Sequence, residues 1–154
     1  MKQTIDDYIL NVLKDLNYKK VIVTGATSGI GLALSRILVF KKAYLIMAVR
    51  NVLKGNLLKD RLLEEFPKAK IEVVCLDQGD FKSIDKFVDK ITTMHPDYDS
   101  LVINAGVFNS NKGVVLDNGY PIVLEQICLA QSISQLKSLK KKLNINIKSF
   151  SKVL

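Results

Sequence analysis

The chain has little of what small secreted, metal-binding and membrane-spanning proteins depend on. Its 154 residues include two cysteines, one histidine and no tryptophan, which are too few thiol and imidazole ligands for a tetrahedral structural zinc site. No apolar run reaches the roughly 18–20 residues of a membrane-spanning helix. The first residues carry acids and no apolar stretch, so they do not predict a signal peptide, and we expect a cytoplasmic protein without a transmembrane segment.

The cysteines and the histidine are isolated from one another. Cys75 and Cys128 each lie in an apolar stretch, and neither belongs to a C-x-x-C pair. We therefore expect both thiols to be buried and reduced. His95 stands before Pro96, a pattern typical of a helix end or turn, and a lone histidine is a poor candidate for a metal ligand or a general base.

The net charge of +8 is concentrated at one end of the chain. From residue 126 onward the sequence has six lysines and neither aspartate nor glutamate. A basic tail of this kind can bind nucleic acid or an anionic membrane. Because the tail has no arginine and Phe150 is its only aromatic residue, we expect a solvated end and no nucleic-acid partner.

Apolar residues alternate between two kinds of spacing along the chain. Short apolar runs predict buried strands at 21–23, 44–49, 71–76 and 101–103. Helical spacing predicts an amphipathic helix at 3–16, then helices through 32–40, 52–66 and 81–94, and a last one from about 121 to 142. One side of helix 52–66 is expected to be buried, namely Leu53, Leu57, Leu58, Leu62 and Phe66. This alternation predicts an α/β fold, a doubly wound parallel sheet with helices on both faces.

A glycine-rich segment lies between the first predicted strand and the following helix. It runs from Thr24 to Gly31 and spaces its glycines as G-x-x-x-G-x-G, a variant of the dinucleotide-binding fingerprint. One glycine permits the tight turn, one lets the backbone approach a pyrophosphate, and one allows the helix to pack closely on the sheet. The free amides and the positive end of the helix dipole then face the phosphates. This segment predicts nucleotide binding.

Further motifs follow in a fixed order. The glycine segment reads T-G-x-x-x-G-I-G, Asp77 follows the third predicted strand, and Asn104-Ala105-Gly106 ends the fourth. Together they resemble the short-chain dehydrogenase/reductase family from about residue 17 to 120. The stretches 48–51 and 54–56 are similar to its retinol dehydrogenase and WW-domain oxidoreductase branch.

This resemblance implies NAD(P)-dependent redox chemistry on alcohols or carbonyls. It also implies a Rossmann-type sheet, incomplete in this chain, with strand order 3-2-1-4 and the cofactor across the carboxyl ends of the strands. The predicted cofactor-binding residues are Thr24, Gly25, Ser28, Gly29, Ile30, Gly31, Arg50, Asn51, Asp77, Asn104, Ala105 and Gly106.

Arg50 indicates which dinucleotide is preferred. Folds of this type that select NAD usually end the second strand with an acid, which holds the ribose 2′-hydroxyl. Arg50 stands there instead, and a charge-assisted contact between arginine and a 2′-phosphate contributes about 1.5–3 kcal/mol. NADP is therefore favoured over NAD. The alternative is that Arg50 only solvates the end of the strand.

The catalytic pair that the resemblance implies is absent. The family uses Tyr-x-x-x-Lys, in which lysine lowers the tyrosine pKa. The residues four positions after Tyr8, Tyr18, Tyr44, Tyr98 and Tyr120 are Val12, Ile22, Ala48, Val102 and Leu124. The similarity also fades beyond residue 120. We expect a truncated form with no catalytic residue, inactive by itself.

The sequence thus divides into an amphipathic helix at 1–16, a nucleotide-binding region at 17–120, and a divergent basic helix and tail at 121–154. Its leading interpretation is an oxidoreductase by descent that retains cofactor binding. The alternatives are a non-catalytic nucleotide-binding or interaction module, or one half of a split dehydrogenase. The fourth strand should form an open sheet edge, where a second copy or a partner chain could pair.

Overall fold

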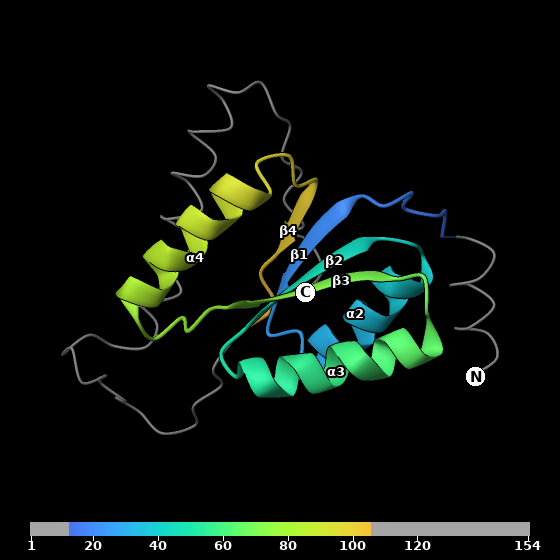
Figure 1. Cartoon of the computed structure of the whole chain (residues 1–154), viewed down its shortest axis with the longest axis horizontal. Helices are drawn as coiled ribbons and strands as arrows, with labels where there is room; N and C mark the ends of the chain where they lie inside the picture. The colour runs from blue at the N-terminus through green and yellow to red at the C-terminus, as the bar shows by residue number, and fades with distance from the viewer. Residues whose placement is uncertain (1–12, 106–154) are drawn as a thin grey trace.

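The computed structural model describes residues 13–105 of the chain, in which strands and helices alternate (Figure 1). The elements in chain order are β1 (Lys20–Thr24), α2 (Gly29–Phe40), β2 (Tyr44–Val49), α3 (Val52–Glu65), β3 (Lys70–Cys75), α4 (Phe81–Met94) and β4 (Ser100–Val102). Each strand predicted from an apolar run is present, within one residue of its expected ends. Across these residues, no helix is long and apolar enough to cross a bilayer.

The strands form one parallel sheet in the order β3-β2-β1-β4. Lys20 of β1 is the register partner of Tyr44 in β2, and Tyr44 is the partner of Lys70 in β3. On the other side of β1, Val21 is paired with Ser100 of β4. The predicted strand order 3-2-1-4 is therefore confirmed.

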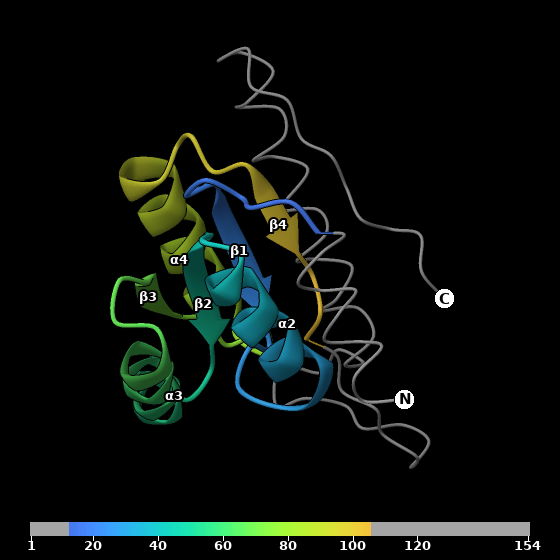
Figure 2. The same ribbon diagram turned by 90° about the vertical axis from the view of Figure 1, so that its right-hand side faces the viewer.

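Helices cover both faces of the sheet, α4 on one and α2 with α3 on the other (Figures 1 and 2). Because successive side chains of a strand point to opposite faces, the continuous apolar runs supply both cores. On the α4 face, Ile22 and Ile46 pack with Ile84, Phe87 and Ile91.

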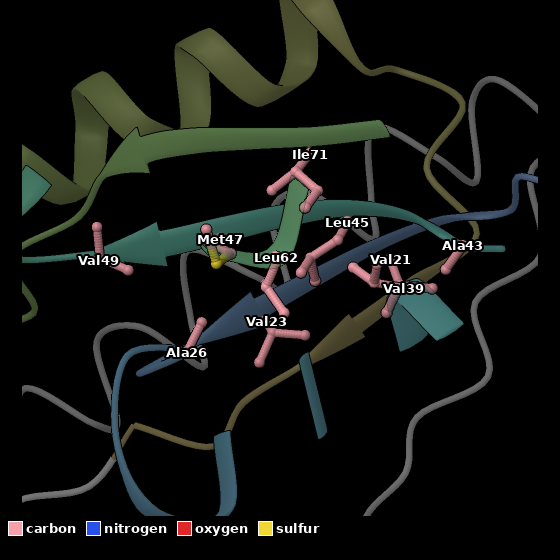
Figure 3. Packing of buried hydrophobic residues seen from close by; sticks show 10 residues of the cluster. All are labelled: Val21, Val23, Ala26, Val39, Ala43, Leu45, Met47, Val49, Leu62 and Ile71. Carbon is pink, nitrogen blue, oxygen red and sulfur yellow. The ribbon is translucent and has the colours of Figure 1, made fainter. Parts of the chain in front are cut away.

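The opposite core lies between the sheet and helices α2 and α3 (Figure 3). Val23 and Met47 of the strands pack there with Val39 of α2 and Leu62 of α3. Val23 and Met47 have no exposed surface, and burying a side chain of this size contributes about 1.5–3 kcal/mol. These two cores hold the strands in place, and the candidate site described below lies at the carboxyl ends of the strands.

The prediction for α3 is confirmed in part, since Leu62 is buried and Leu58 and Phe66 are partly buried against the same core. Two of the five predicted residues face solvent instead. Leu53 and Leu57 are 78% and 63% exposed. Gly55 is buried, and a Cβ added there would lie 2.7 Å from Val73 Cγ1 and 2.9 Å from Val49 Cγ2. The helix therefore approaches the sheet through Gly55, and its 3.6-residue period turns Leu53 and Leu57 outward.

Two further expectations need correction. Cys75 was expected to be buried, but it is exposed at the carboxyl end of edge strand β3, where the alternation of a strand turns it away from the buried side of Val74. Residues 13–16 are not helical, so a helix predicted at 3–16 does not extend that far. Leu16 N instead donates to Lys41 O at 2.7 Å, which ties the chain to the end of α2. Cys128 and residues 1–12 lie outside the described residues.

Candidate functional site

The glycine segment joins β1 to α2 at the carboxyl edge of the sheet. Gly25 and Gly29 have φ angles of +64° and +52°, a left-handed conformation that costs L-residues with a side chain roughly 1–2 kcal/mol each. A Cβ on Gly31 would lie 2.2 Å from Gly25 O, and one on Gly25 would lie 2.9 Å from Ala105 Cα. Two of the three glycines are therefore needed for close packing within the protein.

Gly29 is different, because a Cβ placed on it would meet no atom of the described residues within 4 Å. Ser28, Gly29 and Ile30 are all exposed, and Ile30 is 80% exposed. The backbone here borders space that none of residues 13–105 fills. A ligand can therefore approach the chain closely at Gly29.

The start of α2 also lacks a side-chain cap. Asn51 Oδ1 accepts from Lys54 N at the start of α3, and Asp80 Oδ1 accepts from Lys82 N at the start of α4, both at 2.9 Å. Ser28 is the N-cap of α2, but its side chain makes no such bond. The first amides of α2 are left to bind an anion, which the helix dipole also favours.

The end of β4 is bonded directly to the glycine segment. The backbone amides of Asn104 and Ala105 both donate to Thr24 Oγ1 at 3.0 Å. The Asn104 side chain donates through Nδ2 to Thr24 O at 3.2 Å and to Gly25 O at 3.3 Å. Asn104 is thus the residue that holds the glycine turn in place. Gly106, which was predicted with it, lies outside the described residues.

Arg50 and Asn51 lie at the end of β2, where they serve different roles. Arg50 is exposed, and its guanidinium makes no ion pair or hydrogen bond with another residue of the described range. Asn51 caps α3, as described above, so its side-chain oxygen is used within the protein. Arg50 is therefore an exposed cation at this edge that is available to an anionic ligand.

Asp77 begins a short loop between β3 and α4, next to the end of β2. Leu76 N donates to Val49 O at 3.0 Å, which joins the two strand ends. Asp77 N donates to Ser83 Oγ at 2.9 Å, and Asp77 Oδ1 accepts from Gly79 N at 3.0 Å. These bonds hold the loop together, and the second carboxylate oxygen of Asp77 has no hydrogen bond with the rest of the described chain.

Two residues of this loop region were missed by the sequence analysis. Ser83 supports Asp77 through the bond just described. Gln78 carries an amide nitrogen, Nε2, that is shielded from solvent and has no hydrogen-bond partner among residues 13–105. Neither residue belongs to a recognisable motif, so no sequence signal could have identified them.

Tyr44 and Tyr98 lie apart from the glycine segment. Burial raises the pKa of Tyr98 above its ordinary value, and burial followed by the nearby Glu72 carboxylate raises the pKa of Tyr44. Tyr44 donates to Glu72 Oε2 at 3.3 Å, and His95 Nε2 bonds the same oxygen at 2.8 Å. These groups lie near the amino ends of the strands, away from the glycine segment, and have structural contacts.

The predicted residues that the structure describes therefore gather along one edge of the sheet. The glycine turn, the uncapped start of α2 and the free Arg50 guanidinium supply amides and positive charge. The open space at Gly29 admits close approach. This combination of backbone amides and positive charge suits an anion such as a phosphate group.

Comparison with known proteins agrees with this geometry. The family model for the short chain dehydrogenase matches residues 19–150, which extends beyond residue 120, where the sequence analysis had placed the end of the similarity. The WW domain-containing oxidoreductase of Gallus gallus is 38% identical over 98 residues, 64% of this chain and 24% of that protein. The short chain dehydrogenase/reductase mfmJ of Annulohypoxylon moriforme is 36% identical over 107 residues, 69% of this chain and 31% of that protein.

Solved structures show the same fold. L-sorbose reductase from Gluconobacter frateurii, complexed with NADPH and L-sorbose, matches with a TM-score of 0.65 at 24% identity, over 79% of this chain and 48% of that one. The chain spans about a quarter to a third of the length of the curated relatives described above. With the family model matched over most of the sequence and the motifs of that family assembled at one sheet edge, the chain belongs to the short-chain dehydrogenase/reductase family.

Proposed function

We propose that the chain binds NADP along the carboxyl edge of its sheet, as the cofactor-binding part of a short-chain oxidoreductase. The observation that carries this proposal is the open backbone at Gly29 above the uncapped start of α2. In the proposal, the turn from Gly25 to Gly31 binds the pyrophosphate through backbone amides. Asn104 keeps that turn in its binding conformation, since it donates to the carbonyls of Thr24 and Gly25.

The adenosine half of the cofactor would lie over the ends of β2 and β3. Arg50 would bind the ribose 2′-phosphate, because it is exposed and is not paired with any described acid. No aspartate or glutamate ends β2 to hold the 2′-hydroxyl of NAD. NADP is thus preferred to NAD, and NAD is the weaker ligand of the same site.

The chemistry that NADP supplies when bound is hydride transfer at its nicotinamide ring. The described residues contribute binding, orientation and electrostatic attraction. No tyrosine of the sequence is followed by lysine four positions later, so the proton that accompanies hydride transfer has no donor of the usual kind. We therefore expect cofactor binding by this chain without turnover of an alcohol or a ketone.

Titration of the full chain with NADPH and NADH by calorimetry tests this proposal. We expect saturable binding of NADPH and binding of NADH at least tenfold weaker, since a charge-assisted bond contributes about 1.5–3 kcal/mol. Inorganic pyrophosphate should compete with both. Absence of binding at millimolar NADPH would remove the proposed function.

The outer edge of β4 is a place where a partner strand could bind. Within the described residues β4 pairs only with β1, so a strand from a second copy or another chain could add there. We propose that a second copy of the chain can pair at this edge. Light scattering of the chain with and without NADPH tests this pairing. A mass that stays monomeric at every concentration would exclude self-association.

We also propose a cytoplasmic location, which imaging of a tagged full-length chain would test. One relative, the short-chain dehydrogenase TIC 32 B of Brassica napus, is named as chloroplastic, at 36% identity over 93 residues. Signal from an organelle instead of the cytoplasm would overturn the proposed location.

A further inference from the structure

The segments that lead into the first three strands form a lysine-rich surface at the amino edge of the sheet, opposite the candidate site. Residues 13–19 and 41–43 precede β1 and β2, and residues 66–70 lead into β3. These segments contain six lysines and a single acid, Asp15. The lysines are Lys14, Lys19, Lys41, Lys42, Lys68 and Lys70, and all except Lys41 are exposed. The three segments together are called the amino-edge surface below.

Short contacts join the three segments of the amino-edge surface. Leu16 N donates to Lys41 O at 2.7 Å. Tyr18 N donates to Lys42 O at the same distance. The ammonium group of Lys70 lies 4.8 Å from the centre of the Tyr18 ring. The lysines therefore belong to one continuous surface, although the segments are far apart in the sequence.

The positive charge of this surface is only partly neutralised within the protein. Asp15 is in an ion pair with Lys42. Lys14, Lys19 and Lys68 are in no ion pair within residues 13–105. Three exposed ammonium groups are thus available to an anionic partner.

Most acids that border the surface already have partners. Glu65 is in an ion pair with an arginine of α2. Asp97 is paired with Lys20 Nζ, and Asp99 accepts from Lys20 N at 2.8 Å. Among these border acids, Glu64 is the one that makes no hydrogen bond or ion pair with the residues that the structure describes. The border therefore adds little free negative charge.

The backbone of the amino-edge surface is strained. Asn17, Tyr18 and Lys42 have φ angles of +47°, +62° and +61°, and they are the non-glycine residues of the described range with positive φ. Such strain persists where surrounding contacts enforce it, and it gathers at functional sites. It also holds the Tyr18 side chain at the surface, where it is 49% exposed.

The mixture of lysines and exposed apolar side chains suits an anionic membrane. Leu13 and Phe40 are exposed beside Tyr18 in the same part of the fold. Tyrosine rings reside at the level of lipid headgroups, and lysine stems cover apolar groups while the ammonium reaches the headgroup phosphates. Nucleic acids are commonly recognised by arginine, and the three segments contain no arginine. The composition therefore favours a lipid surface over a nucleic acid.

We propose that the amino-edge surface binds anionic lipid headgroups, so that the chain lies on a membrane with the carboxyl edge of its sheet turned away from the lipid. Attraction of this kind acts over roughly 8 Å at physiological ionic strength. This inference is independent of NADP binding, because the two surfaces lie at opposite ends of the strands.

Sedimentation of the full chain with lipid vesicles tests the proposal. One set of vesicles is phosphatidylcholine alone, and the other contains an equal amount of phosphatidylserine. We expect wild type to bind only the vesicles with phosphatidylserine. The bound chain should be released at about 1 M salt, where the screening length falls to roughly 3 Å.

A triple variant locates the binding surface. Lys14→Gln, Lys19→Gln and Lys68→Gln together remove three exposed charges that make no ion pair in the described range. Each lysine near an anionic membrane contributes about fivefold to binding, so the partition coefficient should fall by about 100-fold. Tyr18→Asn, which suits the left-handed backbone, should give a smaller loss and serves if the triple variant does not fold.

The matched control removes the same number of charges from the basic tail. Lys140→Gln, Lys141→Gln and Lys142→Gln together should leave binding to the vesicles as it is in wild type. An equal loss in this control and in the amino-edge triple variant would mean that net charge alone drives the binding, and it would overturn the proposal.

The remaining outcomes are equally decisive. A wild-type chain that binds no vesicles, or binds both kinds equally, would overturn the proposal. So would a chain that binds a DNA duplex more tightly than vesicles and loses that binding in the amino-edge triple variant. Vesicle binding by a chain that does not bind NADPH would refute the proposed function and still support this inference.

Discussion

Thr24 Oγ1 accepts hydrogen bonds from the backbone amide of Asn104, at 3.0 Å, and from that of the following residue, although Thr24 and Asn104 are 80 positions apart. Thr24 is 1% exposed, so no water replaces it. One hydroxyl thereby joins the glycine turn to the end of β4, and the two sequence motifs become parts of a single site.

Replacing that hydroxyl should destabilise the fold. Thr24→Val keeps the shape of the side chain but leaves two partly buried amides without an acceptor. A fully buried unpaired group costs about 1–3 kcal/mol, and we expect these two together to cost about that much. We expect a comparable fall in the free energy of unfolding, measured by urea denaturation. Thr24→Ser is the control and should lose much less. Equal stability of the valine variant and wild type would contradict the role given to Thr24.

Gly55→Ala should destabilise the chain without affecting nucleotide binding directly. The added Cβ would lie within 3 Å of both Val73 and Val49, and overpacking of this kind costs typically about 1–3 kcal/mol. The intrinsic helix preference of alanine is about 1 kcal/mol better than that of glycine and offsets part of this cost. Thermal denaturation measures the result, and a variant more stable than wild type would show that α3 can move away from the sheet freely.

In contrast to Gly55→Ala, Gly29→Ala should act mainly on nucleotide binding. The new methyl group has space, and its main cost to folding is the positive φ, roughly 1–2 kcal/mol. It would occupy the open approach to the backbone, where the pyrophosphate is proposed to lie. Calorimetry should show at least a tenfold loss of NADPH affinity in a chain that still folds. Unchanged affinity would place the pyrophosphate elsewhere.

Arg50→Leu should change the preference between cofactors. Loss of the guanidinium is expected to weaken NADPH binding by about ten- to 150-fold, equivalent to about 1.5–3 kcal/mol, and to leave NADH almost unaffected. Arg61→Leu is the matched control, since Arg61 is an exposed arginine farther along α3. If the affinities for NADPH and NADH fall equally, Arg50 attracts both cofactors through its charge and does not contact a 2′-phosphate.

The buried Tyr98 hydroxyl should make the free energy of unfolding depend on pH in the alkaline range. Burial raises the pKa of its hydroxyl above the ordinary value of 10.0, because the charged phenolate is poorly solvated there. A raised folded-state pKa means that the stabilisation is fully present below about pH 10 and is lost as pH rises through the folded value.

We therefore expect the free energy of unfolding of Tyr98→Phe to fall less than that of wild type between about pH 9 and 11. Urea denaturation at each pH measures this difference. Tyr44→Phe should act in the same direction, because burial and Glu72 raise the pKa of Tyr44. Identical pH profiles for wild type and Tyr98→Phe would show that Tyr98 does not ionise on unfolding in this range.

Patterns of spacing were enough to predict the elements and the main site. Apolar runs gave the strands, helical spacing gave α4 at 81–94, and three glycines after β1 indicated a nucleotide. These signals are local, because the period of a helix or strand and the φ freedom of glycine are properties of neighbouring residues. The order of the sheet was implied by family resemblance and not by spacing.

Only the tertiary structure decided which of those residues are buried and which contacts they make. Leucine spacing in α3 could not reveal that Gly55 contacts the sheet, nor could the apolar stretch around Cys75 reveal its exposure at an edge strand. The bonds from Asn104 to the glycine turn and the unpaired amide of Gln78 depend on neighbours that are distant in sequence. The amino-acid sequence by itself determined where strands and helices form and that β1 ends in a glycine turn, whereas contacts between distant segments decided burial, exposure and hydrogen-bond partners, because packing depends on what lies across the core.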